Sequence, residues 1–188
     1  MTAYPGVSLS TTESTEQLDS GAWAGDWILD HARSFVRFRS ASMWGLVKVT
    51  GKFSTLRGEG SLDRDGTATG WLELDAWSVD TGNPRRDKHL RSDAFLNALT
   101  HPVITYTVRE ITSDGPGRVR VSGELKVVGY TRPLELTAAI EEADANGATL
   151  STSVAVDQSI WGIDSRLGVV DKTTWVDAKI RLNAVEST

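Results

Sequence analysis

Hydrophobic and polar residues alternate strictly along three stretches of the chain. Residues 118–127 show the pattern best, with the valines and Leu125 on one side and charged residues on the other. Residues 134–141 and 176–182 follow the same rule. Because successive side chains of a strand point to opposite faces of the sheet, each stretch predicts a β-strand with one buried face.

Six further stretches have the length and composition of strands. They are residues 27–38, 46–53, 57–62, 69–77, 103–110 and 150–156. Turn-forming runs rich in Asp, Asn, Gly and Pro separate several of them, at residues 63–66, 113–117 and 144–147. Short strands at hairpin spacing predict an all-β domain, built as a meander, a sandwich or a barrel.

Residues 84–99 break the period of two and predict one helix or two short ones. Pro84 suits the first turn of a helix, and Asn83 before it is a good N-cap. His101 precedes a proline, which disfavours helical geometry, so the helical stretch is expected to end there. A single helical insertion between the strands of a barrel is expected to cover an opening.

The chain is long enough for one domain with one sizeable core, since it has 188 residues of which 39% are hydrophobic. Residues 7–20 are rich in Ser, Thr and Glu and hold few large apolar side chains, which is typical of a segment that stays unfolded. We therefore expect a flexible tail over residues 1–22 and one domain over residues 23–188.

Composition excludes several classes of partner. The net charge is −5 and no long cluster of Lys and Arg occurs, so we expect no nucleic acid. The chain has no cysteine, and its three histidines lack the spacing of a metal pair, so we expect neither a metal nor another cofactor. Residues 1–30 lack Lys, Arg and a continuous apolar segment, which predicts a cytoplasmic protein without a cleaved signal peptide. No run approaches the roughly 18 apolar residues of a membrane-spanning helix. A peripheral membrane contact remains possible, and so does a homodimer.

Residues 85–91 form the one dense group of polar side chains. Arg86 and His89 would offer charged donors to the polar head group of a ligand. Alternatively, Arg86, Asp87 and His89 pair with one another and fix the helix onto the rest of the fold. The residues themselves leave both interpretations open.

Two longer motifs occur at residues 78–92 and 123–134. The first contains Ser-x-x-Thr followed by Arg-Asp-x-His-Leu, and the second contains Gly-x-Leu and Gly-x-Thr-x-Pro. Through these motifs the chain resembles the YceI family of lipocalin-like proteins, which are associated with polyisoprenoid binding. The likeness extends over about residues 27–182. Supporting positions are Gly51, Lys52, Phe53, Gly58, Asp30 and Ser34.

The resemblance implies an eight-stranded antiparallel lipocalin-like β-barrel with the short helical insertion across it and an elongated apolar cavity. A barrel of eight strands is either filled by its own side chains or just wide enough for one slender ligand. We expect inward-facing residues of the alternating strands to line the cavity. The candidates are Phe38, Leu72, Leu74, Val121, Leu125 and Ile180.

The expected function is to bind a long apolar lipid, a polyisoprenoid or an isoprenoid quinone or its precursor, for storage or transport. Burial of such a chain gains about 0.8 kcal/mol per CH₂ group. The alternative is an interaction module whose barrel is filled by side chains and holds no ligand. An enzyme is the third hypothesis, and its acid–base pair would come from Asp87, His89 and Asp93.

Overall fold

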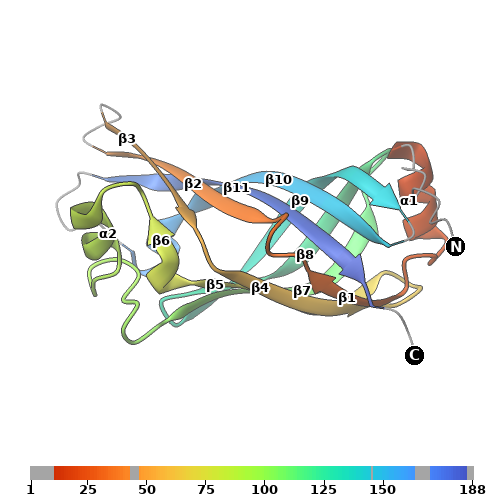
Figure 1. The fold of residues 1–188 in the computed structure, drawn as a ribbon, viewed down its shortest axis with the longest axis horizontal. Coiled ribbons are helices and arrows are strands. Elements are labelled where there is room, and N and C mark those ends of the chain that lie inside the picture. The colour runs from red at the N-terminus through yellow and green to blue at the C-terminus, as the bar shows by residue number, and fades with distance from the viewer. Residues whose placement is uncertain (1–10, 43–46, 145, 164–169, 186–188) are drawn as a thin grey trace, which may run out of the picture.

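The computed structural model describes residues 11–42, 47–144, 146–163 and 170–185, whose strands wind into a barrel (Figure 1). The strands are β1 (Gly25–Leu29), β2 (Phe35–Ser42), β3 (Val47–Phe53), β4 (Leu56–Leu62), β5 (Thr67–Asp75), β6 (Val79–Asp80), β7 (Val103–Ser113), β8 (Arg118–Val127), β9 (Tyr130–Asp144), β10 (Gly147–Asp157) and β11 (Val170–Ala184). The described helices are α1 (Thr11–Asp19), α2 (Pro84–Leu90) and the 3₁₀ helices η1 (Ala76–Ser78) and η2 (Gln158–Trp161).

Closure of the barrel depends on β1, which pairs with β4 on one side and β11 on the other. Trp27 lies opposite Gly60 of β4 and opposite Ala184 of β11. Around the ring the order is β1, β4, β5, β7, β8, β9, β10, β11 and back to β1, with antiparallel pairing. Strands β2, β3 and β6 lengthen the wall, because β2 pairs with β11 and β3, and β3 pairs with β6. The predicted eight-stranded antiparallel barrel is confirmed.

The barrel has two ends with different coverings (Figure 1). One end, called the α1 end, carries α1 and the hairpin turns at residues 63–66 and 114–117. The opposite end, called the α2 end, carries residues 76–102, the β8–β9 turn and η2. The position of the candidate site is described relative to these two ends.

Alternation along the strands sorts side chains between the inside and the outside of the barrel. Strand β8 runs over the predicted residues 118–127, with Val119 and Val121 buried and Arg118 and Arg120 exposed. The period of two therefore identifies the inner face correctly here.

The predicted helical insertion is present as α2, which is shorter than the stretch of residues 84–99. The side-chain oxygen of Asn83 accepts hydrogen bonds from the backbone N–H groups of Arg85 and Arg86 at 3.1 and 3.3 Å, as an N-cap does. The helix ends at Leu90, and turns follow, with Asn97 at a positive φ of 44°.

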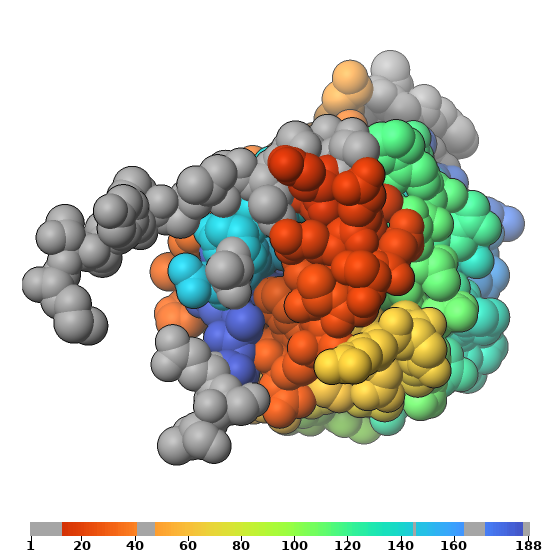
Figure 2. Space-filling view, turned by 90° about the vertical axis from the view of Figure 1, so that its right-hand side faces the viewer, coloured from red at the N-terminus to blue at the C-terminus, as the bar shows by residue number. Residues whose placement is uncertain are grey.

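The expectation of a flexible tail over residues 1–22 is wrong for residues 11–19, which form helix α1. Leu18 is 6% exposed and belongs to the core, and Ser14 is 1% exposed. Thr15 Oγ1 accepts a hydrogen bond from the backbone N–H of Gly117 at 2.7 Å. Figure 2 shows α1 lying across the end of the barrel. One leucine and polar contacts such as that of Thr15 hold the helix, so low overall hydrophobicity was a poor guide to its order. Residues 1–10 lie outside the described part of the chain.

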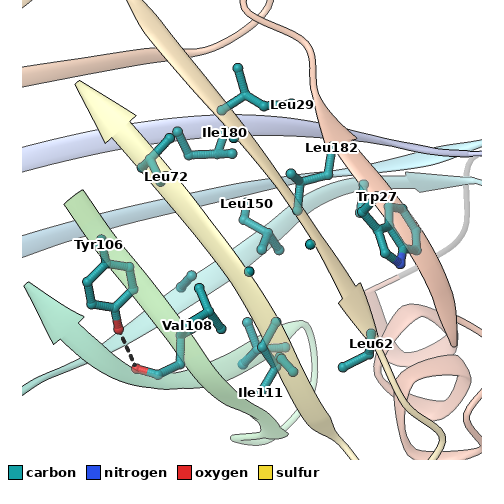
Figure 3. A pocket seen from close by; sticks show the side chains of 18 of the residues that line it. Trp27, Leu29, Leu62, Leu72, Tyr106, Val108, Ile111, Leu150, Ile180 and Leu182 are labelled. Atoms are coloured by element: carbon teal, nitrogen blue, oxygen red, sulfur yellow. Dashed lines mark hydrogen bonds between the residues drawn. The ribbon is translucent and has the colours of Figure 1, made fainter. Parts of the chain in front are cut away.

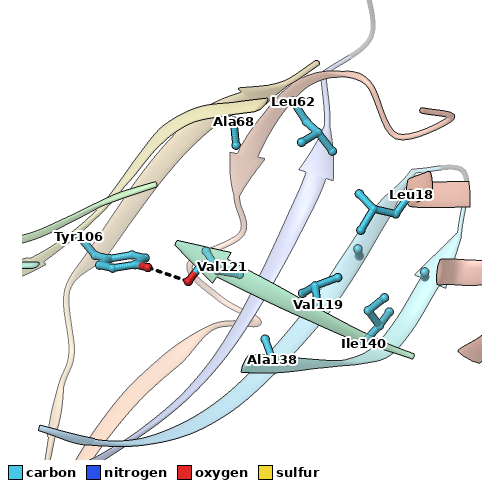
Figure 4. Close-up of a cluster of buried hydrophobic side chains, with 10 residues drawn as sticks. Leu18, Leu62, Ala68, Tyr106, Val119, Val121, Ala138 and Ile140 are labelled. Atoms are coloured by element: carbon cyan, nitrogen blue, oxygen red, sulfur yellow. Dashed lines mark hydrogen bonds between the residues drawn. The ribbon is translucent and has the colours of Figure 1, made fainter. Parts of the chain in front are cut away.

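Buried apolar side chains form two clusters, one toward each end. Figure 4 shows the cluster at the α1 end, in which Leu18 of α1 lies among strand residues. The cluster at the α2 end includes Trp161 and Ile163. Leu72 and Leu125 pack against both clusters, so the core is continuous along the barrel.

None of the helices in the described part of the chain has the length and apolar character needed to cross a membrane.

Candidate functional site

An internal cavity of about 210 Å³ lies in the half of the barrel nearer α1 (Figure 3). Its wall comes from the inner faces of strands on all sides of the ring, and Leu18 of α1 adds to it. The large side chains labelled in Figure 3 are Trp27, Leu29, Leu62, Leu72, Tyr106, Val108, Ile111, Leu150, Ile180 and Leu182. A wall of hydrocarbon with few polar groups is suited to an apolar ligand.

Glycines keep one side of the cavity free of side chains. Gly58, Gly60 and Gly70 all line the space, and Gly60 lies opposite Gly70 in the β4–β5 pair. A Cβ atom on Gly60 would lie 2.8 Å from the carbonyl oxygen of Thr69 and 2.9 Å from Cα of Gly70. A side chain at these positions would therefore clash with the neighbouring strand, and the cavity borders directly on backbone.

Tyr106 brings a phenol group to the cavity wall. Its hydroxyl donates a hydrogen bond to the carbonyl oxygen of Leu134 at 2.9 Å and lies 3.3 Å from that of Val121. Burial raises the pKa of Tyr106 to about 12, and the negative charge of Glu135 adds to this effect. Gly123 makes room for the ring, because a Cβ atom there would lie 2.9 Å from the phenolic oxygen. Tyr106 is therefore neutral at ordinary pH, and its proton is already engaged by the backbone.

Different side chains border the two ends of the cavity. Toward α1, Leu18 and the edge-to-face pair Trp23–Trp27, with ring centroids 6.3 Å apart, border the space. The indole N–H of Trp27 donates to the carbonyl oxygen of Trp23 at 3.0 Å. Toward α2, Trp161 is 2% exposed and donates to the carbonyl oxygen of Leu125 at 3.0 Å. The buried cluster around Trp161 and Ile163 packs the core there, and the cavity lies in the α1 half.

The structure brings three of the six expected lining residues to the cavity wall. Leu72, Val121 and Ile180 line it. Leu74 lies in the buried cluster at the α2 end, and Leu125 packs against both clusters. Phe38 also lies toward α2, where its ring is 5.9 Å from that of Phe53. A role for these residues in lipid binding stays a prediction.

Sequence reasoning missed several parts of the wall. Leu18 was assigned to the tail, Tyr106 was not singled out, and the glycines were not connected with a cavity. Gly58 and Gly60 are two residues apart in one strand, which places them on one face. That spacing is the signal that could have identified them.

The polar group on α2 holds the helix in place at the opposite end from the cavity. The Asp87 carboxylate, in a residue that is 8% exposed, accepts from the backbone N–H of Thr81 at 2.9 Å and from its hydroxyl at 2.5 Å. Nε of Arg86 donates to Oγ1 of Thr81 at 2.8 Å, and the same guanidinium donates to the Thr81 carbonyl oxygen at 3.0 Å. Both residues thus bind Thr81, which immediately follows β6.

His89 does not share this network. It is exposed, and its ring packs edge-on against Phe95 with centroids 4.8 Å apart. Asp87 binds Thr81 and His89 packs against Phe95, so these two residues contact different partners. This arrangement differs from a mutual pairing of Arg86, Asp87 and His89, and it differs from an acid–base pair of Asp87 and His89. Among the described residues, no group of three or more His, Asp and Glu side chains is placed to hold a metal ion.

A closed antiparallel barrel with an apolar internal cavity defines a lipocalin-like binding fold. Residues 27–185 match the model of the YceI-like domain, so the chain belongs to the YceI-like domain family. The matched region begins after α1. A UPF0312 protein of Vibrio campbellii is 25% identical over 174 residues, which covers 90% of this chain and 92% of that protein.

Two solved structures share the fold. BcnA of Burkholderia cenocepacia aligns with a TM-score of 0.72 at 19% identity, over 84% of this chain and 99% of that one. A polyisoprenoid binding domain from Saccharophagus degradans, implicated in plant cell wall breakdown, aligns with a TM-score of 0.71 at 21% identity, over 85% and 98%. The resemblance to the YceI family seen in the motifs is confirmed.

Proposed function

We propose that this protein binds a long apolar lipid, a polyisoprenoid or an isoprenoid quinone or its precursor, inside the barrel for storage or transport. The observation that carries the proposal is the internal cavity at the α1 end, whose wall is almost entirely hydrocarbon. The structural likeness to a polyisoprenoid binding domain supports this class of ligand.

Burial of the lipid chain would supply the affinity. At about 0.8 kcal/mol per CH₂ group, a chain of ten carbons gains about 8 kcal/mol. Loss of translational and rotational freedom on association costs at least about 4 kcal/mol. We therefore expect affinity to rise with chain length until the chain fills the cavity.

The chemistry of the wall favours binding over catalysis. Two titratable residues, Glu59 and Tyr106, are among the described residues that line the cavity. Glu59 is exposed, whereas Tyr106 is buried and its raised pKa keeps it neutral. Its hydroxyl proton is held by the Leu134 carbonyl oxygen. Acid–base catalysis needs a group with a pKa near the working pH, and Tyr106 does not supply one.

The proposal is tested by filling the cavity. Ala178 lines the cavity from β11, so Ala178→Phe would place a ring in the space where a ligand lies. Ala139 is exposed on β9, so Ala139→Phe makes the same change in size outside the barrel. Binding of prenyl alcohols of increasing length is followed by the change in total tryptophan fluorescence, to which Trp23 and Trp27 at the cavity contribute.

We expect Ala178→Phe to weaken binding by at least about tenfold, the equivalent of two lost CH₂ contacts, and Ala139→Phe to bind like the wild type. Equal affinity in the wild type and Ala178→Phe would place the ligand elsewhere. Failure of the wild type to take up any prenyl alcohol or quinone would favour the interaction module without a ligand.

A further inference from the structure

Exposed large hydrophobic side chains gather at the α2 end of the barrel. Leu99 is 85% exposed, Trp77 and Tyr130 are each 50% exposed, and Ile160 is 46% exposed. They lie at the α2 end, in η1, in the segment after α2, at the first residue of β9 and in η2. These four residues are called the apolar rim. Large apolar side chains grouped on an otherwise polar surface mark an interaction site.

Contacts between the connections hold the apolar rim together. The indole N–H of Trp77 donates to the carbonyl oxygen of Ala98, next to Leu99, at 3.0 Å. A Cβ atom on Gly129 would lie 2.9 Å from the ring of His101, which joins the segment after α2 to the β8–β9 turn. A Cβ atom on Gly162 would lie 3.2 Å from the ring of Tyr130, which joins that turn to η2. The connections that carry the apolar rim therefore pack against one another.

The charge at the two ends of the barrel has opposite sign. Apart from the ion pairs Arg39–Asp177 and Lys52–Asp80, the exposed cations at the α2 end, among side chains that the structure describes, are Lys48, Arg85, Lys88, Lys126 and Lys172, against the exposed acids Asp93 and Asp157. At the α1 end the exposed acids prevail. They include Glu13, Glu16, Asp19, Asp26, Asp63 and Asp65. A protein with a net charge of −5 thus presents a basic end.

Cations also lie directly beside the aromatic side chains at this end. The guanidinium of Arg132 lies 5.6 Å from the ring centroid of Tyr130, and that of Arg39 lies 5.9 Å from that of Trp175, which is 46% exposed. Aromatic rings and long cationic side chains are the groups that settle at the boundary between lipid head groups and acyl chains.

We propose that the α2 end docks onto an anionic lipid bilayer, with the apolar rim inserted among the head groups and the surrounding cations paired with lipid phosphates. Charge complementarity favours this partner, because each Lys or Arg near an anionic membrane adds to the attraction. Repulsion of the acidic α1 end would orient the barrel with α2 toward the membrane. The docking does not depend on a ligand in the cavity, so it stands or falls separately from the proposed function.

The test is flotation of the purified full-length chain with vesicles of phosphatidylcholine alone or mixed with phosphatidylglycerol. We expect binding to the anionic vesicles at about 0.01 M salt and its loss at about 1 M, since the Debye length shortens from roughly 30 Å to roughly 3 Å. Two pairs of variants place equal changes at opposite ends. Arg85→Glu with Lys88→Glu is matched by Arg64→Glu with Arg118→Glu, and Leu99→Ser is matched by Ile28→Ser, since Ile28 is 50% exposed on β1.

The charge reversals on α2 are expected to weaken binding by at least about tenfold, and the reversals at the α1 end by less than about twofold. Leu99→Ser should weaken binding, whereas Ile28→Ser should not. Unchanged thermal midpoints would show that the variants are folded. Three results would overturn the proposal: no binding of the wild type to anionic vesicles, equal losses from the two charge reversals, or equal losses from the two serine variants.

Discussion

Leu18 is the apolar side chain by which helix α1 packs against the barrel, so Leu18→Ala is expected to loosen the helix without unfolding the barrel. Leu18 is 6% exposed and lines the cavity. Full burial of a leucine side chain stabilises by about 1.5–3 kcal/mol. Truncation would enlarge an existing cavity that the surrounding strands cannot collapse to fill. We therefore expect α1 to lose about 2 kcal/mol of docking free energy.

A loss of about 2 kcal/mol raises the population of the undocked helix about 30-fold. The contacts that remain are polar and include two hydrogen bonds: Thr15 accepts from the backbone of Gly117 at 2.7 Å, and Gln17 accepts from the indole N–H of Trp23 at 3.1 Å. A helix of nine residues is also too short to persist alone in water. Undocking should therefore unfold α1.

Amide hydrogen exchange measured by mass spectrometry distinguishes local from global opening. In Leu18→Ala, the amides of α1 should exchange about 30-fold faster, while those of β8 should change little. Glu16→Ala, an exposed change on the same helix, should alter neither. The reasoning is refuted if exchange in α1 stays as in the wild type, or if α1 and β8 accelerate by the same factor.

Three further variants test the packing around the site. Gly123→Ala should destabilise the fold by more than about 2 kcal/mol in urea unfolding, because its Cβ atom would clash with the carbonyl oxygen of Thr107. Tyr106→Phe should cost about 1 kcal/mol at neutral pH through the lost hydrogen bond. The wild type should also lose stability between about pH 10 and pH 12. In this range Tyr106 ionises in the unfolded chain but not in the folded chain, where burial raises its pKa to about 12. The phenylalanine variant should lack this loss. Thr81→Val should lower the thermal midpoint, with a cost of about 2 kcal/mol, because its hydroxyl bonds to the charged Asp87 and Arg86, yet it should leave prenyl alcohol affinity unchanged.

Matched variants on the surface control for the type of substitution. Ser122→Ala next to Gly123, Tyr130→Phe at an exposed tyrosine and Thr131→Val at an exposed threonine should each shift stability by less than about 0.5 kcal/mol. A loss of lipid affinity in Thr81→Val would instead show that the polar group on α2 contributes to ligand binding. A wild-type stability that stays flat from pH 10 to pH 12 would contradict the burial of Tyr106.

The period of two placed most strands of the wall, but residues 27–38, predicted as one stretch, form two strands, β1 and β2, with a break at residues 30–34. Residues 118–127 were predicted as one half-buried strand, and β8 occupies this range with Val119 and Val121 inside. The prediction succeeds because one face of such a strand packs against the core and the other contacts water, so apolar and polar residues alternate along it.

Helix α1 could not be predicted from hydrophobicity because its order comes from tertiary contacts. Leu18 is its one buried large apolar residue, and its other buried side chains, Ser14 and Thr15, are polar. Their burial is possible only because the barrel end supplies partners such as the backbone of Gly117. Information of this kind lies in the assembled fold and not in the local sequence.

The cavity likewise depends on quantities that local patterns do not contain. Leu72 and Leu74 both lie on the inner face of β5. Leu72 lines the cavity, whereas Leu74 is buried in the packed cluster at the α2 end. The difference arises from what lies across the barrel: the α2 half is filled by Trp161 and Ile163, and the β4–β5 wall of the α1 half contains glycines. Pattern identifies the inner face, but only the sum of the side-chain volumes decides where space remains.

Native mass spectrometry of the protein as purified, followed by organic extraction and identification of whatever is released, tests the central claim most directly. We expect one apolar molecule of isoprenoid mass per chain, released by solvent and absent after delipidation, with rebinding of the same class of molecule to the empty protein. A bare protein that also fails to take up added prenyl alcohols and quinones would contradict the account, and the barrel would then be an interaction module without a ligand.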